Sequence, residues 1–158
     1  MENNKATIEN LNDLVQINND RIVGYENALK QIEEEEIKEE TTQAGLRSLF
    51  LGFIDDSRRF KMELATEIQT LGSDVANDTS TSGKLHRAWI DVKTAFTGHS
   101  KKSILEECEF GEDAIKKAYE SALEDEDLPA YIRDILNDQL TVLLDAHDEV
   151  KALRDSAW

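Results

Sequence analysis

The sequence contains few of the residues that stabilise small secreted folds or break helices: one Cys, one Pro and seven Gly among 158 residues. The lone Cys108 excludes an intramolecular disulfide and any zinc or iron–sulfur site that needs several cysteines. The scarcity of Pro and Gly, with 39% hydrophobic residues, excludes collagen-like and disordered chains. No apolar run approaches the ~18 residues that span a bilayer, and the N-terminus lacks a signal-peptide pattern, so we expect a cytoplasmic protein without membrane contact.

Acidic residues outnumber basic ones by 34 to 18 and give a net charge of −16. Such a charge repels polyanions, so we expect no nucleic-acid partner. The charge is uneven, because residues 84–102 hold five basic residues against one Asp, which leaves −20 on the remainder. We interpret this basic segment as a strap that docks onto an acidic body. Contact with an anion or a protein partner is the alternative.

Apolar residues recur at alternating spacings of four and three, which is typical of helices that pack along one face. In the first helix this stripe runs from Leu11 to Ile32, and the second helix is expected to end at Gly72. The expected helices span about 5–36, 42–71, 84–97, 101–124 and 129–155. A chain of this length, 1–158, is expected to form a single domain.

The lengths of the connections predict how the helices are joined. The links between the first two and the last two long helices are short, whereas the link between the second and third is long and carries the short helix at 84–97. A long link allows the chain to cross the full length of the bundle before the third long helix begins. The sequence therefore predicts an all-α fold, a four-helix bundle with one crossover.

Four sequence blocks in order are similar to a known family: 11–26, 85–93, 104–113 and 146–155. They resemble a bacterial family of uncharacterised ferritin-like four-helix-bundle proteins, a domain-of-unknown-function family. The resemblance extends from about residue 8 to 155. It implies the ferritin-like fold, and it implies no activity.

A di-iron centre in a ferritin-like bundle uses Glu-x-x-His pairs, because residues at i and i+3 point inward at one level. The residues three positions before the three histidines are Gly83, Phe96 and Leu144. The motif is therefore absent from the chain. This argues against a standard ferroxidase or oxidase centre, and we assign no catalytic residue.

An incomplete metal site is nevertheless conceivable, because helical rise brings several candidate ligands to a similar height in such a bundle. These candidates are Glu26, Glu109, Glu112 and His147. Imidazole with carboxylates suits one divalent ion of iron, manganese or zinc. The alternative is structural: the glutamates pair with Lys or Arg, and His147 is a hydrogen-bonded residue at the edge of the core.

Cys108 lies on the apolar stripe of the third long helix, which predicts a buried, inert thiol and not a nucleophile. With no complete catalytic set, the sequence favours a non-catalytic bundle that works as a binding or assembly component, with a protein partner or as a homo-oligomer. The alternative function is a divalent-metal-binding or redox protein of the ferritin-like class with an atypical carboxylate and histidine site.

Overall fold

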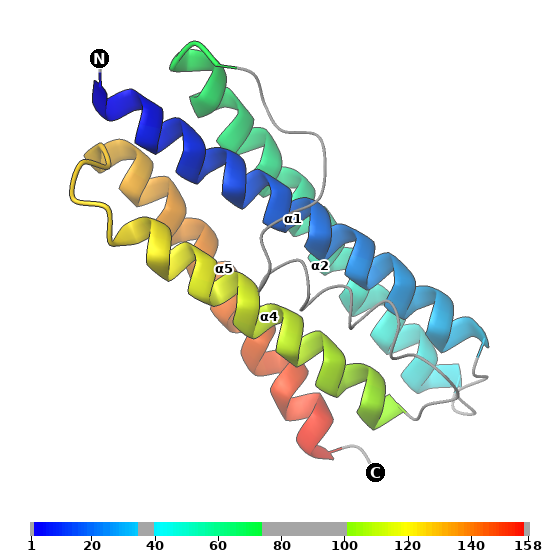
Figure 1. Ribbon diagram of the computed structural model, residues 1–158. Helices are drawn as coiled ribbons and strands as arrows, with labels where there is room; N and C mark the ends of the chain where they lie inside the picture. The colour runs from blue at the N-terminus through cyan, green and yellow to red at the C-terminus, as the bar shows by residue number, and fades with distance from the viewer. Residues whose placement is uncertain (1, 35–39, 74–100, 157–158) are drawn as a thin grey trace.

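The computed structural model describes residues 2–34, 40–73 and 101–156. Every secondary-structure element in these ranges is a helix (Figure 1). The helices are α1 (Glu2–Glu34), α2 (Glu40–Thr70), α4 (Lys101–Leu123) and α5 (Ala130–Ser156). The four long helices thus lie within a few residues of the predicted positions. The short helix expected at 84–97 and most of the basic segment fall outside the described residues.

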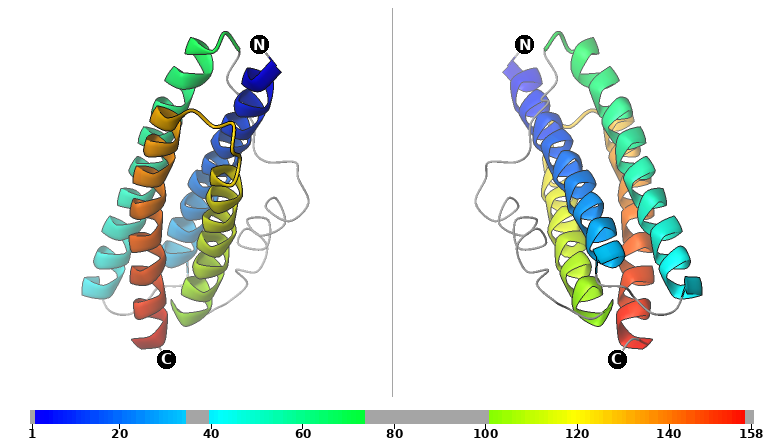
Figure 2. Two further views of the ribbon diagram at one scale, coloured as in Figure 1. Left: turned by 90° about the vertical axis from the view of Figure 1, so that its left-hand side faces the viewer. Right: turned by 90° about the vertical axis from the view of Figure 1, so that its right-hand side faces the viewer.

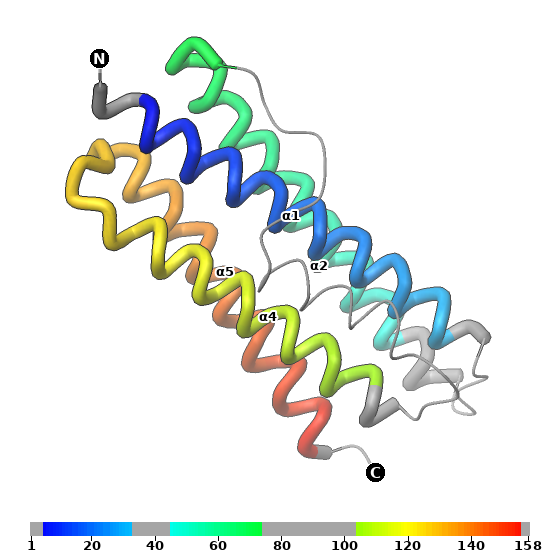
Figure 3. Tube along the Cα trace, viewed as in Figure 1, coloured from blue at the N-terminus to red at the C-terminus, as the bar shows by residue number. Residues whose placement is uncertain are grey.

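The four helices form an antiparallel bundle in which α1 packs against α2 and α4, and α5 packs against α4 and α2 (Figures 1 and 2). Helix α2 ends at one end of the bundle and α4 begins at the other, so the two run in the same direction. The trace in Figure 3 also shows that α1 begins and α5 ends at opposite ends. This connectivity is the ferritin-like arrangement with one crossover, and the predicted fold class is confirmed.

Helix α2 ends at Thr70, and Gly72 follows it as the C′ residue that the sequence predicts. The φ angle of Gly72 is 86°, a left-handed conformation that side chains with a Cβ rarely adopt. The Gly72 N–H donates to the Gln69 carbonyl at 2.9 Å, and the Ser73 N–H donates to the Ile68 carbonyl at 3.1 Å. These are the two hydrogen bonds of a Schellman motif, so the end of α2 is set by local backbone chemistry.

Arg133 contributes two side-chain hydrogen bonds to the connection between α4 and α5. Arg133 donates from Nη1 to the Leu123 carbonyl at 2.6 Å and from Nη2 to the Asp125 carbonyl at 2.8 Å. Its own N–H donates to the carbonyl of Pro129, which begins the hydrogen-bond pattern of α5 at 2.9 Å. Arg133 therefore ties the last carbonyls of α4 to the first turn of α5.

The apolar core consists of two clusters at different heights in the bundle. In one cluster Tyr25 packs against Phe50 and Phe53, with ring centroids 5.1 Å apart in both pairs. The other cluster lies nearer the α4–α5 connection and includes Phe60 and Leu136. A polar layer from α1, α2 and α4 lies between them, and Gln139 of α5 extends it into the second cluster: Asn18, Arg21, Ser57, Glu112 and Gln139. No helix in the described ranges is long and apolar enough to cross a membrane.

Candidate functional site

The centre of the polar layer is an ion pair between α1 and α4. Arg21 Nε donates to Glu112 Oε1 at 2.6 Å, and neither side chain is exposed to solvent. Nη2 donates to Glu112 Oε2 at 3.4 Å, whereas Nη1 reaches α2 and donates to the Phe53 carbonyl at 3.1 Å and to Ser57 Oγ at 3.0 Å. Glu112 also accepts from the Tyr25 hydroxyl at 2.9 Å. The charges of Arg21 and Glu112 are thus paired and hydrogen-bonded, which is the condition for keeping them in a core.

The network continues from Ser57 through the rest of the bundle. Ser57 Oγ donates to Asn18 Oδ1 at 2.9 Å, and Asn18 Nδ2 donates to the Tyr119 hydroxyl at 2.9 Å. Tyr119 in turn donates to Gln139 Oε1 at 2.6 Å, and Gln139 Nε2 donates to Glu63 Oε1 at 2.9 Å. One continuous chain of hydrogen bonds therefore joins all four helices.

Burial sets the protonation states within this layer. Burial alone would lower the pKa of Arg21, but the charge and hydrogen bond of Glu112, together with Tyr25 and Asp56, raise that pKa, so Arg21 stays charged. Burial first, and the charge of Glu112 second, raise the pKa of Tyr25 well above its ordinary value. Burial also raises the pKa of Tyr119 and, with Glu112, that of Cys108. Both tyrosines remain neutral hydrogen-bond donors, and Cys108 is the buried thiol that the sequence predicts.

The ferritin-like fold implies a di-iron centre between the four helices, and the residues present do not fit one. Such a centre needs carboxylate and imidazole ligands from all four helices facing inward. The polar layer offers a single carboxylate, Glu112, and a guanidinium contacts it directly. The other members, Asn18, Ser57 and Gln139, are neutral and hydrogen-bonded to one another or to tyrosine. A fixed positive charge therefore occupies the level at which cations would bind.

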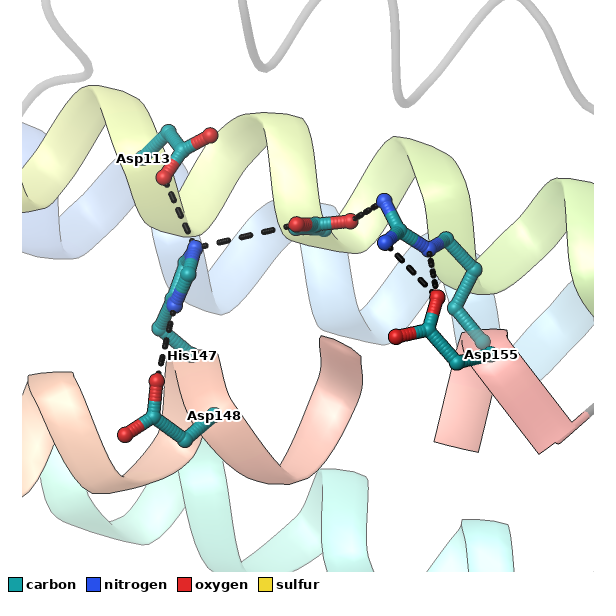
Figure 4. Close-up of polar contacts among 6 residues, drawn as sticks. Asp113, His147, Asp148 and Asp155 are labelled. Carbon is teal, nitrogen blue, oxygen red and sulfur yellow. Dashed lines mark hydrogen bonds and ion pairs between the residues drawn. The ribbon is translucent and has the colours of Figure 1, made fainter. Parts of the chain in front are cut away.

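A second polar group lies between α4 and α5 near the surface (Figure 4). Glu109 and Asp113 are four residues apart on α4, so they share one face of that helix. His147 of α5 faces them, with Nε2 at 2.8 Å from Asp113 Oδ1 and 3.8 Å from Glu109 Oε1. Within the described ranges this is the one group whose potential ligand atoms all lie within 4.8 Å of one another.

The surroundings of this group include both supporting and competing contacts. His147 Nδ1 lies 3.3 Å from Asp148 Oδ1, an arrangement that in metal proteins orients a ligating imidazole. Arg154, from the last turn of α5, contacts Glu109 Oε2 and also pairs with Asp155 at 2.8 Å. The Glu109 and His147 side chains are 12% and 14% exposed, whereas Asp113 is 46% exposed. The group is open to solvent on the Asp113 side, and a cation there would compete with Arg154.

The structure divides the four ligands expected from the sequence. Glu109 and His147 come together between α4 and α5. Glu112 faces the bundle interior, where it is engaged by Arg21 and Tyr25. Glu26 is exposed on α1 and lies outside the group that can hold an ion. Adjacent helical positions diverge because each residue rotates the side chain by about 100°, and Asp113 takes the place that Glu112 was expected to fill.

Two residues of these polar groups, Arg21 and Asp113, were not identified from the sequence, although the sequence contains a pattern that indicates each. Arg21 lies on a second stripe of α1 with the same spacing of four and three as the first: Leu14, Asn18, Arg21, Tyr25, Ala28 and Ile32. All six are buried, so that stripe also faces the core. Asp113 was signalled by its position four residues after Glu109.

Comparisons with known proteins agree with the architecture. The solved structure of a mutant of Dps1 from Mycobacterium smegmatis superposes with a TM-score of 0.72, covering 97% of each chain at 14% sequence identity. At that identity the likeness shows the fold alone. No curated protein matches the chain. A family model matches residues 6–125, and the chain belongs to that family, described as Domain of unknown function (DUF2383).

Proposed function

We propose that this protein is a non-catalytic ferritin-like bundle that works as a binding or assembly component. The observation that carries the proposal is the buried pair of Arg21 and Glu112 at the centre of the bundle. The guanidinium supplies the positive charge that a metal ion would otherwise bring to Glu112. The interior is then a structural layer that connects the four helices, and interactions with other molecules fall to the outer surface.

The proposal is tested by adding ferrous iron to the purified protein in air and following ferric products by near-ultraviolet absorbance. We expect iron to be oxidised no faster than in buffer that contains albumin. Oxidation that is catalytic and is lost in Glu112→Gln, with the helix content unchanged by circular dichroism, would overturn the proposal. Glu63→Gln is a matched control, because it removes an exposed carboxylate at the edge of the same network.

A second candidate function is the binding of one divalent ion at the surface group of Glu109, Asp113 and His147. Three potential ligand atoms within 4.8 Å, with Asp148 behind the imidazole, support it. One imidazole and two carboxylates suit zinc, iron or manganese. Arg154 would have to release Glu109, so we expect the affinity for the ion to be modest.

This candidate is tested by equilibrium dialysis against each ion separately, followed by elemental analysis. His147→Ala and Asp113→Asn are expected to lose the bound ion, and Arg154→Gln is expected to bind it more tightly. Asp145→Asn is the matched control on α5, since this exposed carboxylate lies outside the group. Glu26→Gln should also leave binding unchanged. The site would be contradicted if the unaltered protein retained well under one equivalent of metal. It would also be contradicted if the Asp145→Asn variant lost as much metal as the His147→Ala and Asp113→Asn variants.

A further inference from the structure

The outer face of α2 carries two of the four large apolar side chains that are most exposed in the described residues. Leu51 is 43% exposed and Met62 is 71% exposed. They are eleven residues apart, which is close to three full turns, so both lie on the same side of the helix at a separation of roughly 16 Å. Figure 2 shows α2 along one edge of the bundle. Isolated apolar residues are normal on a surface, but this pair is aligned on one helix face.

Two opposite charges lie between these apolar residues on the same face. Asp55 and Arg58 are 77% and 59% exposed, and the Arg58 Nη1 to Asp55 Oδ1 distance is 3.6 Å. An exposed pair one turn apart contributes little to the stability of the monomer. Asp55 and Arg58 can therefore pair with charges on another molecule at a small cost in free energy.

The order of these four residues is self-complementary. Leu51 and Met62 are equally distant from the point between residues 56 and 57, and Asp55 and Arg58 are equally distant from that same point. When a second α2 lies antiparallel across a two-fold axis at this point, Leu51 of one copy faces Met62 of the other. In the same way, Asp55 of one copy faces Arg58 of the other. An apolar side chain then meets an apolar one, and an acid meets a base, at both symmetric positions.

The charge along this part of α2 also permits two copies to approach. Residues 45–62 hold four basic residues, Arg47, Arg58, Arg59 and Lys61, against Asp55 and Asp56, a net charge of +2. The whole chain carries −16, so most faces of two copies repel one another. This part of α2 lacks the acidic excess of the whole chain, and its mixed charges allow opposite charges to face one another across a two-fold axis.

We propose that a second copy of this chain docks here, α2 against α2, antiparallel across a two-fold axis between residues 56 and 57. Leu51 packs against the partner's Met62, and Asp55 pairs with the partner's Arg58. This inference rests on the proposed function as an assembly component and names the partner and the surface. The contact is isologous, so each pairing occurs twice.

Charge reversal tests the pairing, with the association state measured by sedimentation velocity over a range of concentrations. Asp55→Arg places like charges opposite one another at two positions, and Arg58→Asp does the same. Each is expected to weaken association by roughly tenfold or more. The double variant restores opposite charges at both positions, so we expect it to recover association. A monomeric unaltered protein, or a double variant no better than the single ones, would overturn the proposal.

Arg59→Asp is the matched control for charge reversal. It breaks a pair of the same spacing on the same helix, in which Arg59 is exposed, Asp56 is partly buried, and the Nη1 to Oδ1 distance is also 3.6 Å. The position that would face Arg59 in the antiparallel arrangement is Ile54, which is buried. Arg59→Asp should therefore leave association within about twofold of the unaltered protein. Equal weakening in this variant would assign the effect to general charge and contradict the proposed pairing.

Cysteine cross-linking tests the register independently. A mixture of Leu51→Cys and Met62→Cys proteins is expected to form a disulfide-linked dimer that contains one of each. Each variant alone should cross-link poorly, since a residue and its own symmetry mate are roughly 16 Å apart. Cys108 is buried and does not interfere. Equal cross-linking of Leu51→Cys alone would overturn the register.

These experiments distinguish the inference from the function on which it rests. If the protein is monomeric and does not oxidise iron, the proposed α2 contact is wrong and the non-catalytic proposal stands. If the protein forms a dimer with the expected register and oxidises iron through Glu112, the contact is supported and the non-catalytic proposal is wrong.

Discussion

Arg21 and Glu112 form a buried ion pair between α1 and α4, with Nε and Oε1 2.6 Å apart and both side chains inaccessible to solvent. The pair lies between two apolar clusters and has hydrogen-bonded partners on α1 and α2. Because all of these groups must be placed together, the pair fixes the heights of α1, α2 and α4 relative to one another. A slip of one helix by a turn would leave a buried charge without a partner.

Breaking this pair is expected to destabilise the protein strongly. Arg21→Met leaves Glu112 buried without its cation, and Glu112→Gln leaves the guanidinium without its anion, so each should cost about 3–5 kcal/mol in the free energy of unfolding. Urea unfolding followed by circular dichroism measures this. The double variant Arg21→Met/Glu112→Leu leaves neither charge of the pair buried without its partner. We therefore expect it to lose clearly less free energy of unfolding than the two single variants lose in sum. Arg59→Ala, in an ion pair near the surface of α2, should change stability by about 1 kcal/mol or less.

The Tyr119 hydroxyl connects α1 to α5, because it accepts from Asn18 and donates to Gln139. Tyr119→Phe would leave the Gln139 oxygen without its donor and is expected to lower the free energy of unfolding by about 1–3 kcal/mol. Tyr131→Phe is the control, since that ring is 51% exposed. Equal unfolding midpoints for the two variants would contradict a role for the Tyr119 hydroxyl in stability.

Stability should fall in alkaline solution. The pKa values of Cys108, Tyr25 and Tyr119 are raised in the folded protein from ordinary values of 9.0, 10.0 and 10.0, mainly by burial. Their contribution is complete below these unfolded values, and it decreases as pH rises above them because the unfolded chain then loses protons that the folded chain retains. Urea midpoints should therefore be steady from neutral pH to about 9 and should decline beyond it.

The control for this pH dependence is the variant Tyr25→Phe/Tyr119→Phe with Cys108→Ala. It lacks the three buried acids, so its midpoint should decline less steeply above about pH 9, although it starts lower. An identical slope in the variant and the unaltered protein would show that other groups cause the alkaline loss.

Cys108 should be unreactive in the folded protein. Its side chain is fully buried, and burial together with Glu112 keeps the pKa high, so thiolate is scarce at neutral pH. We expect an aromatic disulfide reagent to label the thiol only in urea. The exposed thiol of Phe110→Cys provides the comparison and should react promptly in buffer, since residue 110 is 54% exposed. Prompt labelling of Cys108 in buffer would mean that this part of the core opens readily.

Arg133 should contribute to the stability of the α4–α5 connection. Arg133→Ala removes two charge-assisted hydrogen bonds to the Leu123 and Asp125 carbonyls and is expected to cost about 1–3 kcal/mol in urea unfolding. Arg133→Lys keeps the charge but cannot reach both carbonyls at once, so we expect only partial rescue. Full rescue by Lys would indicate that charge alone matters.

The heptad spacing from Leu11 to Ile32 and its counterparts determined the four long helices, because an apolar stripe must be buried and only partner helices can bury it. Gly72 determined the end of α2 through its own backbone conformation. The absence of Glu-x-x-His was equally visible in the chain, and among the described residues the carboxylate at the centre of the polar layer, Glu112, is paired with Arg21.

Only the tertiary structure decided which polar residues meet. Glu109 and Glu112 are three residues apart, yet one faces His147 and the other faces Arg21, because the packing of α5 and α1 selects different sides of α4. The partner of Glu112 lies 91 residues away in the chain. Helical periodicity fixes the side of a helix on which a residue lies, but the neighbour on that side depends on the rotation and height of another helix. Those two quantities are set by the packing of the whole bundle.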